Sequence, residues 1–534
     1  MDGFLERRYP IGIQTFSEIV NGHYVYVDKT AYVYRMTHAG AKYYFLARPR
    51  RFGKSLLSST LRSYFEGRQN LFKGLTIETL EKEWTEYPVL HLDLSLAKNQ
   101  ASPQDMQRML MFLLRPYAEK YGRKEDETTP GSLIVGLIQR AHELTGRQVA
   151  VIVDEYDAPL LEVLHTDEAL AEYRRILQEF YQPLKAMEPH IRFCFITGIT
   201  KFSQLSIFST INNLKNISMD ADFSAVCGIT ESELGTTLAP DIEYLAIANE
   251  CTPEEIHDKL KMRYDGYHFA HPSEDIYNPF SLLFSFDSRK LDNYWFSTGT
   301  PSYLIRQMQY FHTDITTLDN MEVPAAAFDR PTEAMTSALP ILYQSGYLTI
   351  KDFDKEVETY ILSIPNQEVR IGFTEGLLPT YIGLDSPDVQ IGFAARFWRA
   401  LKKDDINQAM EELQAYLASL PYVEGFKKKL AEVSNAEGFY EWTFYLIFSM
   451  LNVYARTQVK TSCGRADIVV HMPDTIYVFE LKTSGTALEA LEQIKSRGYA
   501  IPYSADRRNT IKVGIKFSIE TKTIEGWAIE GETE

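Results

Sequence analysis

The chain has 534 residues, of which 45% are hydrophobic and 24% charged; this composition is that of a globular protein and excludes a mostly disordered chain. At roughly 150 residues per domain, the length predicts three or four domains. The 55 Lys and Arg against 72 Asp and Glu leave a net charge of −17, which excludes a general electrostatic affinity for nucleic acid or anionic membranes. Any contact with a polyanion must therefore come from a local basic cluster.

The four cysteines, Cys194, Cys227, Cys251 and Cys463, contain no C-x-x-C pair. Their spacing excludes a disulfide framework and a zinc ribbon and favours a reducing cytoplasm. The first residues lack the apolar stretch of a signal peptide, and the most apolar segment, 439–453, is too short to cross a bilayer. We therefore expect a cytoplasmic protein without membrane association.

The first third of the chain alternates buried strands with helices. Apolar runs predict strands over 43–47, 149–153 and 191–196, and apolar spacing predicts helices over 56–65 and 168–187. Continuous apolar strands that alternate with helices are typical of a parallel sheet covered on both faces. We predict an α/β domain of the P-loop NTPase type over residues 1–235.

A candidate phosphate-binding loop follows the first strand. The sequence from Arg48 through Gly53-Lys54-Ser55 lies between a strand and a helix, where backbone N–H groups and a helix N-terminus hold phosphates. Gly53 would admit the anion, Lys54 would reach the β- and γ-phosphates and Ser55 would bind Mg²⁺. Arg48 replaces the first glycine of the motif, and the arginines of this loop could partly compensate by adding positive charge.

An acidic pair ends the strand 149–153. Asp154 is a candidate Mg²⁺ partner, and Glu155 is a candidate base that orients the attacking water. A sheet edge with solvated carboxylates is the alternative interpretation. The chain separation between this pair and Lys54 favours the nucleotide site.

The middle region, 236–430, is predicted to be mostly helical. Thr252-Pro253-Glu254-Glu255 has the cap, proline and capping glutamate of a helix start. Between residues 346 and 364, two apolar runs flank a charged turn and predict a β-hairpin. A hairpin flanked by helices is typical of a winged-helix module, and a helical linker with one hairpin is an equally good interpretation.

The last region, 431–534, is predicted to be a second α/β domain. A helix is expected over 437–454, strands over 466–470, 475–480 and 511–515, and a helix over 487–497.

A carboxylate–lysine set lies on the first two of these strands. Glu480 and Lys482 point to the same face because side chains alternate along a strand, and a hairpin would bring Asp467 beside them. Two carboxylates can hold a divalent metal through oxygen ligands, and a neighbouring lysine can position a water and offset the charge of a phosphodiester. Glu437 is a further candidate carboxylate, and a surface Glu–Lys pair is the structural alternative.

Several longer strings carry a resemblance to a known family. They are Tyr26-Val27-Asp28-Lys29-Thr30, Arg48–Ser55, Asp154-Glu155-Tyr156-Asp157, Thr200-Lys201-Phe202-Ser203, Tyr264-Asp265-Gly266-Tyr267, Tyr277-Asn278-Pro279, Tyr343-Gln344-Ser345-Gly346-Tyr347 and the Asp467/Glu480/Lys482 set. Over nearly its whole length the chain resembles bacterial and archaeal proteins with an AAA-ATPase-like N-terminal domain and a PD-(D/E)XK nuclease-like, restriction-endonuclease-like C-terminal domain.

The resemblance implies ATP binding at Gly53, Lys54 and Ser55, with Asp154 as Mg²⁺ partner and Glu155 as base. It also implies Mg²⁺-dependent nuclease chemistry at Asp467 and Glu480 as metal ligands with Lys482 beside them. The expected partner is nucleic acid, with DNA favoured over RNA.

Three hypotheses follow from these residues. The first is an ATP-regulated nuclease. The second is a nucleotide-dependent switch or scaffold whose C-terminal domain only binds. The third is a DNA-binding regulator that acts through the winged-helix-like segment; the acidity of the chain opposes it.

Overall fold

A computed structural model divides the chain into two compact units. The first comprises Met1–Thr313 and Leu318–Glu368, and the second comprises the remaining residues. The predicted division into three domains at residues 235 and 430 stays a prediction. The structure describes residues 7–98, 100–161, 167–200, 214–297, 304, 307–308, 310–311, 313, 318–328, 335–373, 388–419, 454–461, 464–472, 474–504, 506–518, 520–521 and 523–530.

A five-stranded parallel sheet forms the centre of the first unit, in the order β2-β3-β4-β1-β5. The three strands predicted from apolar runs are β1, β3 and β4, and nearly all of their residues are buried. Strands β2 and β5 were not predicted. The strand bounds are β1 Tyr43–Ala47, β2 Val89–Asp93, β3 Val149–Asp154, β4 Ile191–Gly198 and β5 Lys215–Asn216.

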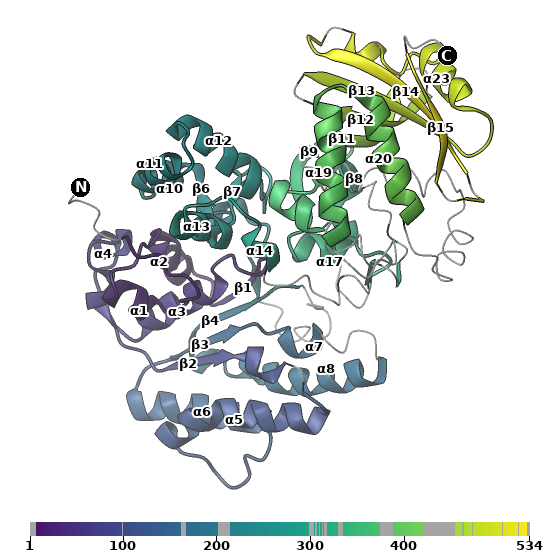
Figure 1. The fold of residues 1–534 in the computed structure, drawn as a ribbon. Helices are drawn as coiled ribbons and strands as arrows, with labels where there is room; N and C mark the ends of the chain where they lie inside the picture. The colour runs from purple at the N-terminus through teal and green to yellow at the C-terminus, as the bar shows by residue number, and fades with distance from the viewer. Residues whose placement is uncertain are drawn as a thin grey trace. The chain divides into compact units, whose positions relative to one another are not determined.

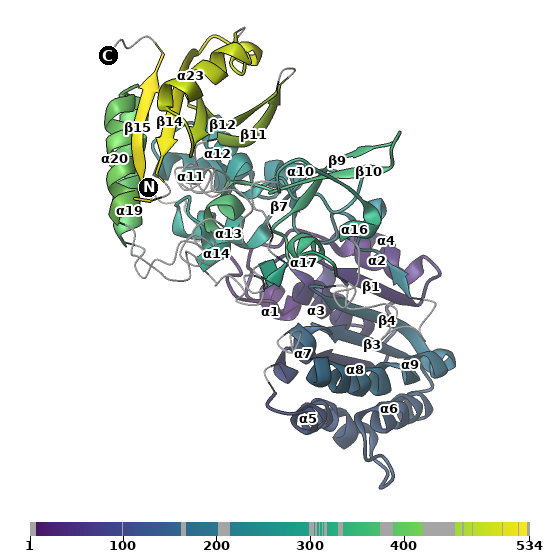
Figure 2. The same ribbon diagram turned by 90° about the vertical axis from the view of Figure 1, so that its right-hand side faces the viewer.

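Helices cover both faces of this sheet, which explains why its central strands are continuously apolar. Figure 1 shows α3 (Lys54–Phe65) on one face and α5 (Pro103–Tyr121) and α6 (Pro130–Thr145) on the other. Helix α8 (Asp167–Tyr181) packs against α5 and α6, which lie side by side in Figure 2. The predicted parallel α/β sheet is confirmed.

The following part of the first unit is mostly helical, as predicted. Its helices include α10 (Glu231–Thr236), α11 (Ala239–Ala248), α12 (Pro253–Tyr264), α13 (Pro279–Ser288) and α14 (Tyr294–Ser297). The start of α12 has the predicted capping box: Thr252 Oγ1 accepts from Glu255 N–H at 3.2 Å, and Thr252 N–H donates to the Glu255 carboxylate at 2.9 Å. These reciprocal bonds satisfy two N–H groups that the helix itself leaves unpaired.

The predicted hairpin is also present. Strands β9 (Thr349–Asp354) and β10 (Thr359–Ser363) pair antiparallel, and β8 (Met321–Pro324) joins β10 as a third strand. The two described helices beside them, α16 (Ala325–Phe328) and α17 (Leu339–Gln344), contain no Lys or Arg. Since a helix that reads DNA needs cationic side chains, these helices do not support the DNA-binding regulator.

The second unit contains a mixed sheet in the order β11-β12-β13-β14-β15. Only β13 and β14 pair parallel, and helix α23 (Ala487–Ser496) makes the crossover that this pairing requires. Strands β11 and β15 extend the predicted sheet. The strand bounds are β11 Tyr454–Thr461, β12 Gly464–His471, β13 Thr475–Lys482, β14 Asn509–Phe517 and β15 Ile524–Ile529.

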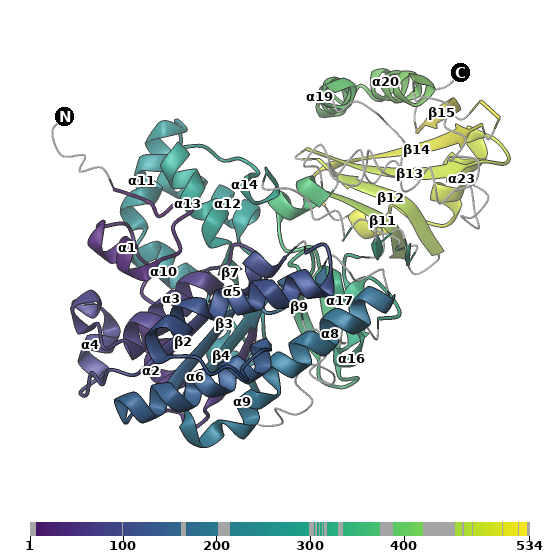
Figure 3. The ribbon, with the colours of Figure 1, turned by 90° about the horizontal axis from the view of Figure 1, so that it is seen from below.

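The two faces of this sheet are covered by different helices. Val469, Ile476 and Val478 pack with α23 on one face. The alternate residues Ile468 and Phe479 pack with α19 (Asp388–Lys402) and α20 (Ile406–Ser419) on the other, and Figure 3 shows these two helices together on one side of the sheet. Some of the sequence predictions lie outside the described residues. They are the predicted helix 437–454 up to residue 453, the candidate Glu437, and residues 201–203 of the string Thr200-Lys201-Phe202-Ser203.

Among the described residues, none of the helices combines the length and the apolar character that crossing a membrane requires.

A buried carboxylate in the first unit predicts a pH dependence of its stability. Glu368 is fully buried, and one of its oxygens accepts from Ser281 Oγ at 2.9 Å and from Trp295 N–H at 2.8 Å. Burial raises the pKa of Glu368 to about 7, above its ordinary value of 4.5. The folded state therefore binds this proton more tightly than the unfolded chain does. The contribution of Glu368 is fully present below about pH 4.5 and is lost as the pH rises through about 7.

We expect Glu368→Gln to remove this dependence, because the amide stays neutral. The melting temperature of the variant should equal that of the wild type at about pH 4.5 and exceed it by a few degrees at about pH 8. Calorimetry across this pH range measures the difference. The exposed Glu143→Gln is the matched control, and a difference independent of pH would contradict the prediction.

Candidate functional sites

The candidate phosphate loop connects β1 to α3, as its sequence predicts. Gly53 precedes the first helical residue and has a φ of +93°, a left-handed conformation that favours glycine. A Cβ at this position would meet no atom within 4 Å, so the backbone conformation, not space, requires glycine. Lys54 and Ser55 follow in the first helical turn, where the unpaired N–H groups of a helix favour an anion.

Lys54 turns back toward its own loop. Its side chain is buried, with 5% of the residue exposed, and its ammonium donates to the carbonyls of Arg48 at 3.0 Å and Pro49 at 2.9 Å. Burial lowers the pKa of Lys54, and the nearby carboxylates of Asp154 and Glu155 oppose that shift. The loop therefore holds a buried cation close to the acidic end of β3.

The acidic pair lies at the same edge of the sheet as the loop. Burial raises the pKa of Asp154 to about 6, and a hydrogen bond from Ser55 and the charge of Lys54 oppose this rise. Burial also raises the pKa of Glu155, and the positive charges of Lys54 and Arg50 oppose this rise. The structure thus brings together Lys54, Ser55, Asp154 and Glu155, which the sequence proposed for one site.

Glu155 adopts an uncommon backbone conformation. Its φ of +50° lies in the left-handed region, which costs a residue other than glycine of order 1 kcal/mol or more. The turn that it makes lets Tyr156 N–H donate to the carbonyl of Thr197, on the neighbouring strand β4, at 3.0 Å. Strain of this kind is typical of a residue held for function.

Asp93 is a third carboxylate at this edge, which sequence reasoning missed. It ends β2 and lies directly opposite Asp154 in the parallel register. Its charge raises the pKa of both Asp154 and Glu155. The only sequence signal is a short strand that ends in aspartate, and such strands are common.

Asp157 is a further residue that sequence reasoning left without a role. It is fully buried, and its Oδ2 accepts from Ile199 N–H at 3.0 Å, Thr200 N–H at 2.7 Å and Thr200 Oγ1–H at 2.6 Å. The hydroxyl of Tyr156 also donates to the Thr200 carbonyl at 3.0 Å. The turn after β3 therefore holds the end of β4 in place.

Arg48 has a structural role, which corrects the suggestion that it adds charge to the phosphate site. Its buried guanidinium donates to the carbonyls of Ala47, Ser218, Phe223 and Ser224. The guanidinium carbon also lies 4.2 Å from the centroid of the Phe269 ring. With both terminal nitrogens of its guanidinium engaged in this way, Arg48 occupies the position of the motif's first glycine and joins β1 to residues 218–224.

Aromatic residues from the helical part pack against the loop. The ring of Phe52 lies 4.7 Å from that of Tyr267 and 5.3 Å from that of Phe269, centroid to centroid. The indole N–H of Trp295 donates to the carbonyl of Arg50 at 3.3 Å. Tyr267 and Phe52 each belong to one of the strings singled out in the sequence, so two of these strings meet at the loop.

A small cavity adjoins the loop on the side of α3. Its volume is about 90 Å³, and its lining is mostly apolar, including Val27, Gly53, Leu57 and Val226. Lys29 also lines it and pairs with Glu233 at 2.6 Å.

In the second unit, the predicted carboxylate–lysine set lies on one face of the sheet. Ile468 is opposite Phe479, so Asp467 and Glu480 come next along the two antiparallel strands. One oxygen of Asp467 accepts from Leu481 N–H at 2.8 Å. The ammonium of Lys482 lies 3.7 Å from Glu480 Oε1. The three side chains are therefore neighbours, as the alternation of the strands predicts.

Glu480 is the most buried member of this set, with 2% of the residue exposed. Burial and the charge of Asp467 raise the pKa of Glu480 to about 8, and Lys482 opposes this rise. Gln493, on α23, donates to Glu480 Oε1 and lies 3.4 Å from the hydroxyl of Tyr499. Gln493 therefore contacts the site directly, and Tyr499 contacts Gln493.

The residues present fit a divalent metal. Glu480 Oε2 is buried without a hydrogen-bond partner, and Asp467 adds a second carboxylate from the next strand. Hard divalent cations take oxygen ligands and often use one or two carboxylates with water or substrate. Among the described residues no group of three or more His, Cys, Asp or Glu forms a complete metal cluster, so substrate or water would supply the remaining ligands.

Comparison with known proteins matches two parts of the chain to family models. A family model described as "Predicted AAA-ATPase" matches residues 10–208, and one described as "PD-(D/E)XK nuclease superfamily" matches residues 435–527. The chain is also 33% identical over 538 residues to a protein of Azotobacter chroococcum mcd 1 described as "Uncharacterized protein in vnfD 5'region". That similarity covers 98% of this chain and 99% of the relative.

Proposed function

Because this chain belongs to the family of predicted AAA-ATPases with a C-terminal domain of the PD-(D/E)XK nuclease superfamily, we propose that it is an ATP-regulated, Mg²⁺-dependent nuclease. ATP binds the first unit, and the second unit cleaves nucleic acid, with DNA favoured over RNA. The low cysteine content supports a cytoplasmic location.

In the first unit, each residue of the loop has a distinct task. Lys54 leaves its loop carbonyls to pair with the phosphates, and the backbone around Gly53 approaches them closely. Ser55 and Asp154, which already share a hydrogen bond, would hold Mg²⁺. Glu155 orients the attacking water, and its raised pKa suits it to accept a proton.

In the second unit, Asp467 and Glu480 would hold the divalent metal. When bound, such an ion polarises the phosphodiester and lowers the pKa of a water ligand. Lys482 places a positive charge beside these carboxylates, where it offsets the negative charge that develops on the phosphate. Gln493 fixes the orientation of Glu480 by its hydrogen bond.

The single observation that carries the nuclease proposal is the state of Glu480. A buried carboxylate with one oxygen unpaired beside a second carboxylate costs stability. A structural role would not need this arrangement, because a neutral residue of the same shape would cost less. A cation that binds both carboxylates explains why the site retains them.

The test is a cleavage assay on DNA and RNA, with and without Mg²⁺ and ATP. We expect Mg²⁺-dependent cleavage whose rate changes on addition of ATP. Lys482→Ala should lower the rate by about 100- to 1,000-fold, the range found when one group that stabilises transition-state charge is removed. Lys402→Ala, at the end of α19 on the opposite face of the sheet, is the matched control. No metal-dependent cleavage of either nucleic acid would refute the proposal.

One observation favours the alternative of a nucleotide-dependent switch or scaffold. The ammonium of Lys54 already has two carbonyl partners at 3.0 and 2.9 Å, so the loop is stable with its lysine engaged. Such a loop can bind a nucleotide and change conformation without turnover. Tight ATP binding with no measurable hydrolysis, together with no cleavage, would select this alternative.

A further inference from the structure

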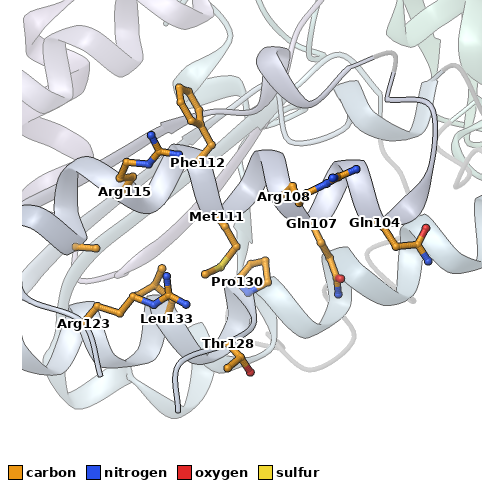
Figure 4. Close-up of a pocket in the computed structure, with 11 residues that line it drawn as sticks. Gln104, Gln107, Arg108, Met111, Phe112, Arg115, Arg123, Thr128, Pro130 and Leu133 are labelled. Carbon is orange, nitrogen blue, oxygen red and sulfur yellow. The ribbon is translucent and has the colours of Figure 1, made fainter. Parts of the chain in front are cut away.

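A groove on the outer surface of the first unit shares no lining residue with the phosphate loop or the acidic pair of that unit. It has a volume of about 690 Å³ and runs between α5 and the segment 123–133 that leads into α6. Figure 4 shows its lining, which includes three arginines and no carboxylate. The lining residues are Gln104, Gln107, Arg108, Met111, Phe112, Arg115, Ala118, Arg123, Thr128, Pro130 and Leu133.

The cationic lining stands out against the charge of the whole chain. The protein carries a net charge of −17, so an acidic ligand is repelled by most of its surface. Within the groove, Arg108, Arg115 and Arg123 are exposed residues. The Arg108 side chain is 77% exposed although it pairs with Asp105, and Arg123 donates to the carbonyl of Glu127 at 2.9 Å. This is a local basic cluster of the kind that a polyanion needs on an acidic protein.

An exposed aromatic ring lies within the same cluster. Phe112 is 49% exposed, which is unusual for a large apolar side chain, and it lines the groove beside Met111. The guanidinium carbon of Arg115 lies 4.8 Å from the centroid of its ring, and Figure 4 shows the two side chains next to each other. A ring and a guanidinium held together in this way offer flat surfaces on which nucleobases stack.

We propose that this groove binds single-stranded nucleic acid. Arg108 and Arg115 are seven residues apart on α5, and therefore about 10 Å apart along the helix axis at 1.5 Å per residue. Both can contact phosphates of one strand while Phe112, which lies between them in sequence, stacks on a base. The amides of Gln104 and Gln107 add donors and acceptors for base edges.

A single strand fits these side chains better than a duplex or an acidic peptide does. Bases in a duplex are stacked on each other and offer no free face to Phe112, and a peptide of Asp and Glu offers charge without flat rings. The groove shares no residue with the phosphate loop or with the carboxylate–lysine set. Binding here therefore does not depend on the proposed nuclease activity.

The test measures the binding of a fluorescently labelled oligo(dT) of about 20 nucleotides by anisotropy, in EDTA so that the C-terminal carboxylates hold no metal. The logarithm of the association constant falls linearly with the logarithm of the salt concentration, with a slope of about −0.7 for each phosphate of a single strand that the protein contacts. The slope therefore gives the number of phosphates contacted. Arg108→Gln/Arg115→Gln should reduce the magnitude of the slope by about 1.4, which is twice 0.7. The control with the same charge change is Arg147→Gln/Arg175→Gln, at two exposed arginines elsewhere on the unit.

Phe112→Leu separates stacking from charge. It should weaken binding roughly 5- to 100-fold, the range for loss of one stacked base, and leave the salt slope unchanged. All of these substitutions are at exposed side chains, and an unchanged melting temperature verifies the fold.

Two results would overturn the proposal. The first is equal affinity and slope for the wild type, the groove double variant and its control. The second is competition by poly-glutamate as effective as that by unlabelled oligo(dT), together with no effect of Phe112→Leu, which would assign the groove to an acidic peptide.

Discussion

Glu480→Gln is expected to abolish nuclease activity and, in metal-free buffer, to make the second unit more stable. The two effects have one cause. The Glu480 carboxyl group is buried with Oε2 unpaired and lies near Asp467, so the fold bears the cost of keeping an acid there. Glutamine has nearly the same shape and is neutral. Its amide oxygen can still accept the bond from Gln493.

The loss of activity should be about 100-fold or more, because a residue that holds the metal directly matters at least as much as its supporting neighbours. Cleavage rates at saturating Mg²⁺ measure the first effect. Melting temperatures in EDTA measure the second, and a rise of a few degrees is expected. Glu492→Gln, at an exposed position of α23, should change neither quantity. Retained activity, or a variant that is less stable than the wild type, would show that Glu480 is structural.

Lys54→Ala is expected to weaken ATP binding at the first unit by about 100-fold. Lys54 is a buried cation in the loop beside Asp154 and Glu155, and its ammonium is the group that the phosphates would take over from the carbonyls of Arg48 and Pro49. A charge-assisted contact of this kind contributes about 3 kcal/mol when partly buried, which corresponds to a roughly 100-fold weaker affinity. Equilibrium binding of a fluorescent ATP analogue in the presence of Mg²⁺ measures the change.

The matched control is Arg51→Ala, in the same loop. Arg51 is exposed, and its guanidinium carbon lies 4.8 Å from the centroid of the Phe280 ring, so it carries the same charge in the same loop without being buried there. We expect its removal to change affinity by only a few-fold. If ATP regulates cleavage through this loop, Lys54→Ala should also make cleavage insensitive to ATP while its metal dependence stays intact. Equal losses in the two variants would show that the loop attracts ATP by charge alone.

Much of the candidate chemistry could be predicted because it depends on patterns within one or two neighbouring elements. The apolar runs of β1, β3 and β4 identify strands buried on both faces, and Asp154 is found at the end of one of them. Alternation along β13 is enough to place Glu480 and Lys482 on one face of the strand. The cap of α12 is likewise local to Thr252 and Glu255.

Other features depend on segments far apart in the chain. Arg48 has the sequence position of a phosphate-binding glycine, and its contacts with residues 218–224 decide that its role is structural. Asp93 reaches the site only because β2 pairs with β3. Asp157 gains a role because the end of β4 lies beside it.

The sequence by itself therefore determined the kinds of element and the chemical groups at their ends, since hydrophobic period and capping act over a few residues. Only the tertiary structure decided which carboxylates share an edge, where the donors of Arg48 are used and that Arg108, Phe112 and Arg115 line one groove with Arg123. These outcomes depend on strand order and helix packing. Both are set by the burial of whole faces and not by the residues that end up side by side.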